Sequence, residues 1–513
     1  MRLPLPGRYP VPSVHPPFAA GLTIPRPDVP SANDVQVLIL GGGVTGIVAA
    51  QMLHRRGIHN FKIVEAREEL GGRMKAFEFG APGRRYTLEL GADWIHGTQT
   101  GDGPSNPIFE LAKKHELLTQ PNDYRHSMTT FDYTGQVDYL ETYYTAVDSF
   151  ANLTVAAGKR VSKGLVDVTA RNGYSIIGSH PRTHHEIASE YYQFDWELGQ
   201  TPEQSSWIAS SWATNFTFNV DQGGYSHDNL LTVDQRGFAS VMQEEAAEFL
   251  SEEQVALNAT VESIEYSKEG VEVALKGGER LSADYALVTF SLGVLQNGDV
   301  RFEPQLPEWK SEAIHGMTMG TYTKIYLQFP EKFWFDTEFA LYADLERGRY
   351  PVWQSLDLQG FFPGSGILFV TVTGDYSKRI EALPDKQVKD EVLSVLRSMY
   401  PNVTVPEPDD FYFPRWHSDP LYRGSYSNWP ASLVMGHHKN LRAPVEERLW
   451  FGGEATSLKY FGYLHGAYFE GMKMGEHIAQ CVLGVACDGL PHVEEILNSS
   501  PYDTLSALTG LTD

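Results

Sequence analysis

The sequence predicts an α/β fold with more than one domain: a parallel sheet with an antiparallel meander, and a second domain of α+β type. Three observations support this fold class. A strand, a glycine-rich turn, a helix and a second strand follow one another within residues 35–66, which is the order of a βαβ unit. Residues 259–290 alternate apolar and polar side chains between glycine breaks, as antiparallel strands do. The chain of 513 residues also exceeds the size of one compact core.

The βαβ unit begins with residues 35–40, VQVLIL, a short apolar run suited to a buried parallel strand. Residues 44–56 have the pattern of a helix, and Gly57 stands where a glycine commonly ends one. Residues 61–66, FKIVEA, form the next strand. Together these segments predict the first half of a parallel sheet.

Four later segments extend this pattern. Residues 237–250 have helical periodicity, and the meander of residues 259–290 leads into a buried strand. Residues 448–456, RLWFGGEAT, read as an apolar strand that ends in a glycine turn, and a helix opens within residues 462–484. The stretches between these segments are less regular and rich in aromatic residues, which assigns them to the second domain.

The glycine-rich turn carries the first functional motif. Gly41, Gly43 and Gly46 form G-x-G-x-x-G between the first strand and its helix. The first glycine permits the tight turn, the second lets backbone N–H groups approach a pyrophosphate, and the third lets the helix pack on the sheet. Glu65, at the end of the second strand, is placed to accept hydrogen bonds from an unphosphorylated ribose. These features predict a dinucleotide site.

The formal net charge of −24 disfavours nucleic acid and anionic membranes as partners and attracts cationic ligands, although solubility alone also explains it. No stretch approaches the apolar run that a bilayer span requires. Cys481 and Cys487 are the two cysteines, too few for a zinc or iron–sulfur site, and no metal is expected. They are either one short disulfide or two free thiols.

The compartment is expected to be extracellular. Five N-x-S/T sequons exceed chance expectation and favour the secretory route; they lie at Asn152, Asn215, Asn258, Asn402 and Asn498. Residues 1–33 form a proline-rich extended arm without a recognisable signal peptide. Cytoplasmic or peroxisomal residence is the alternative. The oligomeric state stays open, with a monomer favoured.

Residues 65–77, EAREELGGRMKAF, distinguish between the possible dinucleotides. The second glycine turn, Gly71 and Gly72, is followed by the cation Arg73, which suits the phosphate and flavin end of FAD. Here the chain resembles the flavin-containing amine oxidase family, most closely its polyamine oxidases of the spermine and spermidine type. The resemblance continues in four further motifs: LELGADWIHG (88–97), TYTKIYLQFP (321–330), YRGSYSNWP (422–430) and FGGEATSLKYFGYLHGAY (451–468).

The resemblance implies two domains. One is an FAD-binding Rossmann-like domain assembled from separated segments, and the other binds substrate. The expected limits are 34–113, 229–317 and 425–487 for the FAD-binding domain, 114–228 and 318–424 for the substrate domain, and 488–513 for a C-terminal tail.

The resemblance also implies which residues contact the FAD cofactor. Glu65 would hold the adenosine ribose, Arg73 the phosphate or flavin edge, and Val261 the adenine through its backbone. Glu454 would bond the ribityl–pyrophosphate region, and the helix starting near Leu464 would point its N-terminus at the flavin, where it stabilises negative charge. The segment that carries a flavin-linking cysteine in monoamine oxidases has none here, so FAD should be non-covalent.

Lys324 is the first residue expected at the reaction site. On a strand, Tyr322, Lys324 and Tyr326 share one face. By resemblance, Lys324 holds a water beside the reactive flavin nitrogen and assists reoxidation by oxygen; spacing alone favours an edge lysine facing solvent. Tyr426 and Tyr463 match the two aromatic residues that enclose the substrate amine.

The substrate tunnel is expected to include Trp94 and His96 of the motif GADWIHG. His96 could bond a substrate nitrogen or be a structural histidine. Glu197, or its neighbour Asp195, matches a tunnel carboxylate that holds a distal ammonium. Leu198 stands where some relatives carry an aromatic residue, which alters the tunnel shape.

The resemblance implies oxidation of spermine, spermidine or their N-acetyl forms. Hydride would pass to flavin, and oxygen would reoxidise it, giving an aldehyde, a smaller amine and hydrogen peroxide. An L-amino-acid oxidase would carry an arginine shortly after the GA of GADWIHG, which this chain lacks. A monoamine oxidase of the same family or a non-catalytic flavin-binding protein would share the cofactor motifs.

Overall fold

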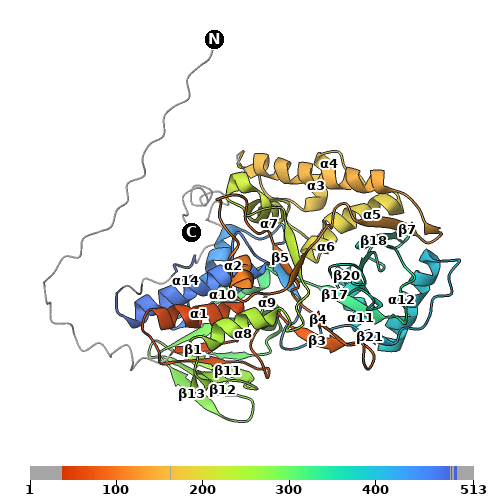
Figure 1. Cartoon of the computed structure of the whole chain (residues 1–513). Helices are drawn as coiled ribbons and strands as arrows, with labels where there is room; N and C mark the ends of the chain where they lie inside the picture. Colours follow the sequence, from red (N-terminus) through yellow and green to blue (C-terminus); the bar gives the residue numbers. More distant parts are fainter. Residues whose placement is uncertain (1–36, 162, 486, 488–489, 494–513) are drawn as a thin grey trace, which may run out of the picture.

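The computed structural model describes residues 37–161, 163–485, 487 and 490–493. The expected arm at residues 1–33 and most of the expected tail lie outside these residues. Two large sheets dominate the described part, one on each side of the molecule, and a group of helices, among them α3, α4 and α7, lies above them in Figure 1.

The first sheet is parallel, with the strand order β10-β2-β1-β14-β23. Its strands are β1 (Val37–Leu40), β2 (Phe61–Val64), β10 (Val255–Ala256), β14 (Tyr285–Val288) and β23 (Leu449–Phe451). They are short and apolar because both faces are covered. Alternate side chains pack on one face against α1 (Val44–Arg55) and α14 (Leu464–Val482).

The meander covers the other face of this sheet. It consists of β11 (Val261–Tyr266), β12 (Val271–Leu275) and β13 (Arg280–Ala283), which pair antiparallel, and β15 (Arg301–Glu303) joins β11 in parallel. The chain passes from β13 into the buried strand β14 of the parallel sheet. The predicted fold class, a parallel sheet with a meander, is therefore confirmed.

The second large sheet is mixed, with the order β21-β17-β20-β19-β18-β7-β8. In chain order its strands are β7 (Met128–Asp132), β8 (Gly135–Gln136), β17 (Tyr322–Gln328), β18 (Phe339–Ala343), β19 (Val352–Ser355), β20 (Ile367–Thr373) and β21 (Asp410–Tyr412). Helices α11 (Gly374–Glu381) and α12 (Asp385–Met399) cover one face. The opposite face packs against aromatic side chains from α3 (Leu140–Val161) and α5 (His184–Gln193).

Smaller elements complete the described fold. The short strands are β3 (Ala76–Phe79), β4 (Tyr86–Glu89), β5 (Trp94–His96), β6 (Thr119–Pro121), β9 (Asn229–Thr232), β16 (Thr318–Gly320) and β22 (Tyr426–Asn428). The remaining helices are α2 (Pro107–Lys114), α4 (Ala170–Ile176), α6 (Asp195–Leu198), α7 (Trp207–Phe218), α8 (Ala239–Ala247), α9 (Leu292–Asn297), α10 (Glu308–Gly316) and α13 (Met435–Arg442), with 3-10 turns η1 (Val220–Gln222), η2 (Glu252–Gln254) and η3 (Glu454–Thr456).

The expected helices and strands are present, with ends that shift by a few residues. The helix expected at 237–250 is α8, and the strand expected at 61–66 ends at Val64, so that Glu65 stands just beyond it. Strands of the parallel sheet come from each of the three segments expected to form the FAD-binding domain; the domain limits themselves stay a prediction. None of the described helices combines the length and apolar character needed to cross a bilayer.

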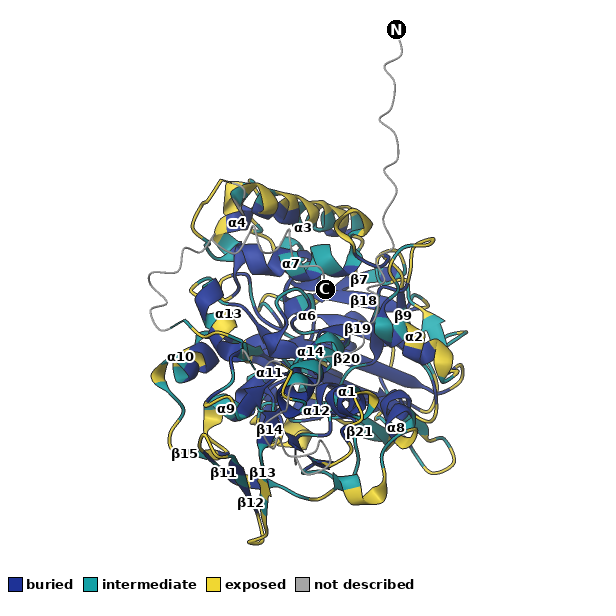
Figure 2. Cartoon of the chain, turned by 90° about the vertical axis from the view of Figure 1, so that its left-hand side faces the viewer, coloured by how far each residue is buried: buried dark blue, intermediate teal, exposed yellow. Residues whose placement is uncertain are grey.

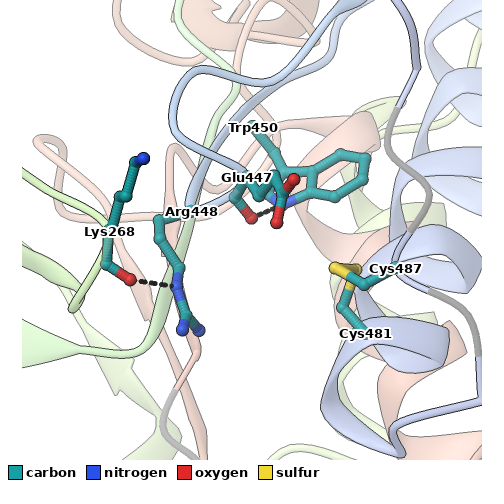
Figure 3. Close-up of a disulfide and its surroundings, with 6 residues drawn as sticks. All are labelled: Lys268, Glu447, Arg448, Trp450, Cys481 and Cys487. Atoms are coloured by element: carbon teal, nitrogen blue, oxygen red, sulfur yellow. Dashed lines mark hydrogen bonds between the residues drawn. A yellow bond between two sulfur atoms is a disulfide. The ribbon is translucent and has the colours of Figure 1, made fainter.

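A disulfide joins Cys481, near the C-terminal end of α14, to Cys487, so the two cysteines are bonded rather than free thiols. Cys481 is buried in the same apolar cluster as Trp450 of β23, and Figure 3 shows the bond with this tryptophan nearby. Figure 2 shows how strongly burial concentrates in the sheets, whereas the outer faces of α3 and α4 are exposed.

Candidate active site

A cavity of about 410 Å³ lies where the two large sheets approach each other. Its lining includes the glycine turn after β1, the segment after β2, the first residues of β17 and the start of α14. Most of the residues expected at the site line it: Gly41, Gly43, Glu65, Gly72, Arg73, Trp94, His96, Glu197, Val261, Tyr322, Lys324, Tyr426, Glu454, Tyr463 and Leu464. Gly46 does not line the cavity.

The glycine turn has no room for side chains. Gly41 has a φ of +116°, and a Cβ there would collide with the Thr289 hydroxyl. A Cβ on Gly46 would collide with the carbonyl oxygen of Gly41, so this glycine allows α1 to approach β1. Gly43 and Gly72 face each other across the cavity wall, where a Cβ on Gly72 would lie 3.0 Å from the Cα of Gly43. The two glycine turns therefore present bare backbone to the cavity.

Two long helices begin at this cavity. α1 has Gly43 at its N-cap, and α14 has Tyr463 there; neither residue caps the helix with its side chain. The first N–H groups of both helices therefore remain for other acceptors, and the positive end of each helix dipole favours negative charge. Such an arrangement suits a pyrophosphate at α1 and an electron-rich ring at α14.

Glu65 and Arg67 form the part of the cavity next to β2. Glu65 accepts hydrogen bonds from the backbone N–H groups of Gly42 at 2.7 Å and of Arg67 at 2.9 Å. The guanidinium nitrogens of Arg67 are buried and make no hydrogen bond among the described residues; the carboxylates of Glu65 and Glu69 lie 3.8 and 3.5 Å away. Buried donors of this kind require an acceptor, and a phosphate or ribose oxygen of a dinucleotide would supply it.

Arg73 and Glu454 connect the second glycine turn to the C-terminal segments. The Arg73 Nη1 donates to Glu454 at 2.9 Å and to the Ser425 carbonyl at 2.9 Å. Glu454 also accepts hydrogen bonds from the backbone N–H and hydroxyl of Ser427 and from the N–H of Gly462. Both Glu454 oxygens are thus engaged by protein donors, so Glu454 positions these turns, and its expected contact with the ribityl–pyrophosphate region stays a prediction.

Lys324 is buried on the inner face of β17, with 2 % of its surface exposed. β17 lies between β21 and β20, so the alternative of a solvent-facing edge lysine is wrong. Its Nζ lies 2.7 Å from the Asp93 carboxylate and donates to the carbonyls of Gly91 at 2.8 Å and Glu89 at 3.3 Å. Burial raises the pKa of Asp93, and the neighbouring Lys324 opposes that rise.

Glu197 is hydrogen-bonded to both of the expected aromatic residues. The Tyr463 hydroxyl donates to Glu197 Oε1 at 2.6 Å, and the Tyr426 hydroxyl donates to the Glu197 carbonyl at 3.0 Å. Burial raises the pKa of Glu197, whereas the bond from Tyr463 lowers it. Within the described ranges no lysine, arginine or histidine pairs with this carboxylate. The cavity therefore contains a half-buried acid that lacks a cation.

Aromatic and imidazole rings form the walls around Glu197. Trp94 and His96 are alternate residues of β5 and lie on the same side of the strand, their ring centroids 6.1 Å apart. The His96 ring also contacts Tyr463 at 4.9 Å. Burial lowers the pKa of His96 to about 4, so its imidazole is neutral at pH 7. Tyr322 is nearby, 6.2 Å from the ring of Tyr426.

Asp195, the alternative to Glu197, has a different environment. It forms a bidentate ion pair with Arg347, at 3.0 and 2.7 Å, and does not line the cavity. Asp195 therefore anchors α6, and the carboxylate that faces the cavity is Glu197. Leu198 also lines the cavity, as does Trp196, whose buried indole N–H has no partner among the described residues.

Sequence reasoning did not single out Arg67, Asp93 or Trp196. Each stands within or beside a stretch that was recognised: Arg67 in EAREELGGR, Asp93 in GADWIHG, and Trp196 between the two candidate acids. A charged residue inside an otherwise apolar motif was the available signal for Asp93. The adenine contact of Val261 and the flavin contact of the α14 N-terminus at Leu464 stay predictions, although both residues line the cavity.

The fold and the cavity fit a dinucleotide-binding oxidoreductase whose cavity carries an acid, Glu197, and a buried lysine, Lys324. A family model for flavin-containing amine oxidoreductases matches residues 44–478. The chain belongs to this family and is an FAD-dependent amine oxidase. The bare glycine turns, the uncapped helix starts and the Arg67 guanidinium without a hydrogen bond, all within the described residues, fit FAD.

Named relatives agree with this membership. The chain is 35% identical over 481 residues to "Polyamine oxidase 1" of Zea mays, covering 88% of this chain and 92% of that protein. It is 35% identical over 463 residues to "Polyamine oxidase 7" of Oryza sativa subsp. japonica, covering 85% and 93%. Its fold is similar to that of cyclohexylamine oxidase from Brevibacterium oxydans IH-35A, with a TM-score of 0.66 at 19% identity, over 88% of this chain and 99% of that one.

Proposed function

We propose that this protein oxidises polyamines such as spermine, spermidine or their N-acetyl forms, with oxygen as the acceptor and hydrogen peroxide as a product. One observation carries the proposal: the half-buried Glu197 carboxylate faces the cavity and has no cationic partner within the described residues. A carboxylate held largely away from water without a cation is costly, and a distal ammonium of a polyamine would pair with it. The curated relatives are named polyamine oxidases, which supports the same substrate class.

The residues that line the cavity have different roles toward a polyamine substrate. Glu197 holds an ammonium that does not react, which fixes how far the chain extends along the cavity. The rings of Tyr426, Tyr463 and Trp94 exclude water from the reacting nitrogen, and exclusion of water favours the neutral amine that the reaction needs. His96 is neutral and offers a hydrogen-bonding nitrogen without adding a charge that would repel the amine.

FAD, when bound, supplies the redox chemistry by accepting a hydride equivalent and passing electrons to oxygen. Lys324 places a fixed ammonium group at the other end of the chamber, where Asp93 and two carbonyl oxygens hold it. A fixed cation in a water-poor site stabilises negative charge that develops nearby. We therefore assign Lys324 to the oxygen half of the reaction.

The cavity gives less support to an amino acid or a monoamine as substrate. An α-amino acid needs a cation for its carboxylate, but Lys324 in the described cavity already pairs with Asp93, and Arg67 and Arg73 lie next to the glycine turns. A monoamine would leave Glu197 without a partner. These differences favour a substrate with at least two amino groups.

The direct test measures peroxide release from spermine, spermidine, N-acetylspermine, an alkyl monoamine and an L-amino acid, with identification of the products. We expect kcat/KM for the best polyamine to exceed that for the monoamine by about 100-fold. This is the usual contribution of a buried charge pair to affinity. Equal turnover of the monoamine, or preference for the amino acid, would refute the proposal. Flavin binding without peroxide from any amine would support a non-catalytic role.

The bound FAD is proposed to be non-covalent. Both cysteines of the chain are joined in the disulfide, so the thiol that could link a flavin is absent from Ser425 and its neighbours. Acid precipitation of the yellow protein should release all of the flavin into the supernatant. Flavin that stays with the precipitated protein would contradict this expectation.

Secretion is also proposed. The sequon residues Asn152, Asn258 and Asn402 are exposed, Asn215 is half-buried on α7, and Asn498 lies outside the described residues. The disulfide is typical of oxidising compartments. Protein from its native source should lose apparent mass on treatment with an N-glycosidase, and its occupied asparagines should be among the exposed three. Unmodified protein recovered from cell lysate would favour the cytoplasm or the peroxisome.

A further inference from the structure

The second domain contains a cluster of metal-ligating side chains away from the cavity. Asp132 ends β7, while His184 and His185 are the first two residues of α5. One ligand atom from each of the three residues lies within 4.8 Å of the other two. None of the three lines the active-site cavity, so the cluster is separate from the amine chemistry.

The distances within the cluster are close to those of a tetrahedral site. Asp132 Oδ2 lies 3.0 Å from His185 Nε2 and 3.7 Å from His184 Nε2. With bonds of about 2.0–2.2 Å, two ligands of a tetrahedral Zn²⁺ stand about 3.4 Å apart. The two distances to Asp132 Oδ2 lie on either side of this value, and the two histidine nitrogens are within 4.8 Å of each other.

The side chains are held in this orientation before any ion binds. The other oxygen of Asp132 accepts hydrogen bonds from the Thr134 N–H at 2.8 Å and its hydroxyl at 2.6 Å. The His185 ring stacks on Tyr139, with centroids 4.4 Å apart and planes inclined by 14°. Thr183 fixes the start of α5 with a capping box. Such supporting contacts orient ligands in natural metal sites.

The cluster contains no lysine or arginine among the described residues, and His185 Nε2 shares a hydrogen bond with Asp132 Oδ2 at 3.0 Å that a bound ion would replace. The Nε2 of His184 is buried and makes no hydrogen bond within the described residues, and in the same part of the chain the charged partners of Asp132 are the two histidines. A second group, His115, Glu245 and Glu248, offers a contrast. There the Lys114 ammonium already pairs with both glutamates, so that group supplies its own positive charge.

We propose that Asp132, His184 and His185 bind one Zn²⁺ ion, with water as the fourth ligand. Two imidazole nitrogens and one carboxylate oxygen are a ligand set that zinc favours. The two histidine side chains are each 24% exposed, whereas the Nε2 of His184 is buried, so the ion would lie just below the surface. The bound ion would connect the β7–β8 hairpin to the start of α5.

The test titrates tag-free holoenzyme with Zn²⁺ by isothermal calorimetry after treatment with a chelator. We expect one equivalent to bind, and we expect H184Q and H185Q each to weaken binding at least about 100-fold, more than a change outside the ligand set does. T134V retains all three ligands and should weaken binding about 10-fold through loss of orientation. The matched control is H126Q, which alters an exposed His–Asp pair with Asp123 and should bind like wild type.

Turnover of the best amine verifies that each variant is folded, because none of these residues lines the cavity. Absence of zinc binding by the wild-type holoenzyme would overturn the proposal. Equal zinc affinity of wild type and the folded H184Q and H185Q variants would overturn it as well.

Discussion

Replacing Lys324 with methionine is expected to slow the reaction of the reduced enzyme with oxygen about 100-fold, the usual loss when one preorganised charge-stabilising group is removed. The Lys324 Nζ is fixed by Asp93 at 2.7 Å and by two backbone carbonyls. Methionine fills similar space but carries no charge. Reduction by the amine without oxygen should change less than about threefold. Stopped-flow absorbance measures the two half-reactions separately.

Two further variants test whether the charge itself matters. Y326F removes another hydrogen bond to the same Glu89 carbonyl, at 2.7 Å, and should leave the oxygen reaction unchanged. D93N removes the carboxylate that holds the Lys324 Nζ at 2.7 Å, so the oxygen reaction should slow, but by less than in K324M. Asp93 is thus a positioning residue. If K324M slowed both half-reactions equally, the assignment of Lys324 to oxygen would be wrong.

Replacing Glu197 with glutamine is expected to lower kcat/KM for spermine about 100-fold, because the glutamine amide cannot neutralise a buried ammonium. Most of the loss should come from KM. An alkyl monoamine has no distal ammonium, and its kcat/KM should stay within about threefold. The control E203Q alters a carboxylate that pairs with Arg171 at 2.6 Å outside the cavity, and spermine kinetics should be unchanged.

The pH dependence of KM gives a second measure of the Glu197 role. Burial raises the pKa of this carboxyl above its ordinary value. As the pH falls through that raised pKa, Glu197 becomes protonated and loses its attraction for the ammonium, so KM for spermine should rise on the acid side. E197Q should lack this rise. His96 contributes little above pH 5, since its pKa is about 4. An unchanged acid limb in E197Q would contradict the assignment.

The parts of the site that sequence alone predicted are those built from contiguous residues. The glycines of 41–46 and 71–72 dictate backbone geometry within a few positions, and the apolar runs around them read directly as strand and helix. Lys324 was recognisable from the contiguous motif TYTKIYLQFP, whereas its alternation with Tyr322 and Tyr326 favoured a solvent-facing lysine. These features need no knowledge of distant contacts.

The features that sequence missed depend on pairing between distant segments. Asp93 matters because β17 brings Lys324 against it, and Arg67 is notable because its guanidinium is buried without a hydrogen bond among the described residues. Helix α3 is rich in threonine, tyrosine and valine, which have modest helix propensity. Packing of Tyr143 and Leu153 against the neighbouring helices stabilises it. The sequence pattern within one segment does not reveal such contacts with distant segments.

The central claim is that one cavity holds the flavin beside Lys324 and a polyamine whose distal ammonium pairs with Glu197. Anaerobic mixing of the holoenzyme with spermine tests it most directly. The account predicts that the absorbance of oxidised flavin bleaches completely, with half-saturation about 100-fold higher in E197Q and a similar limiting rate. Wild-type enzyme that stays yellow with spermine, or an E197Q variant with unaltered half-saturation, would contradict the claim.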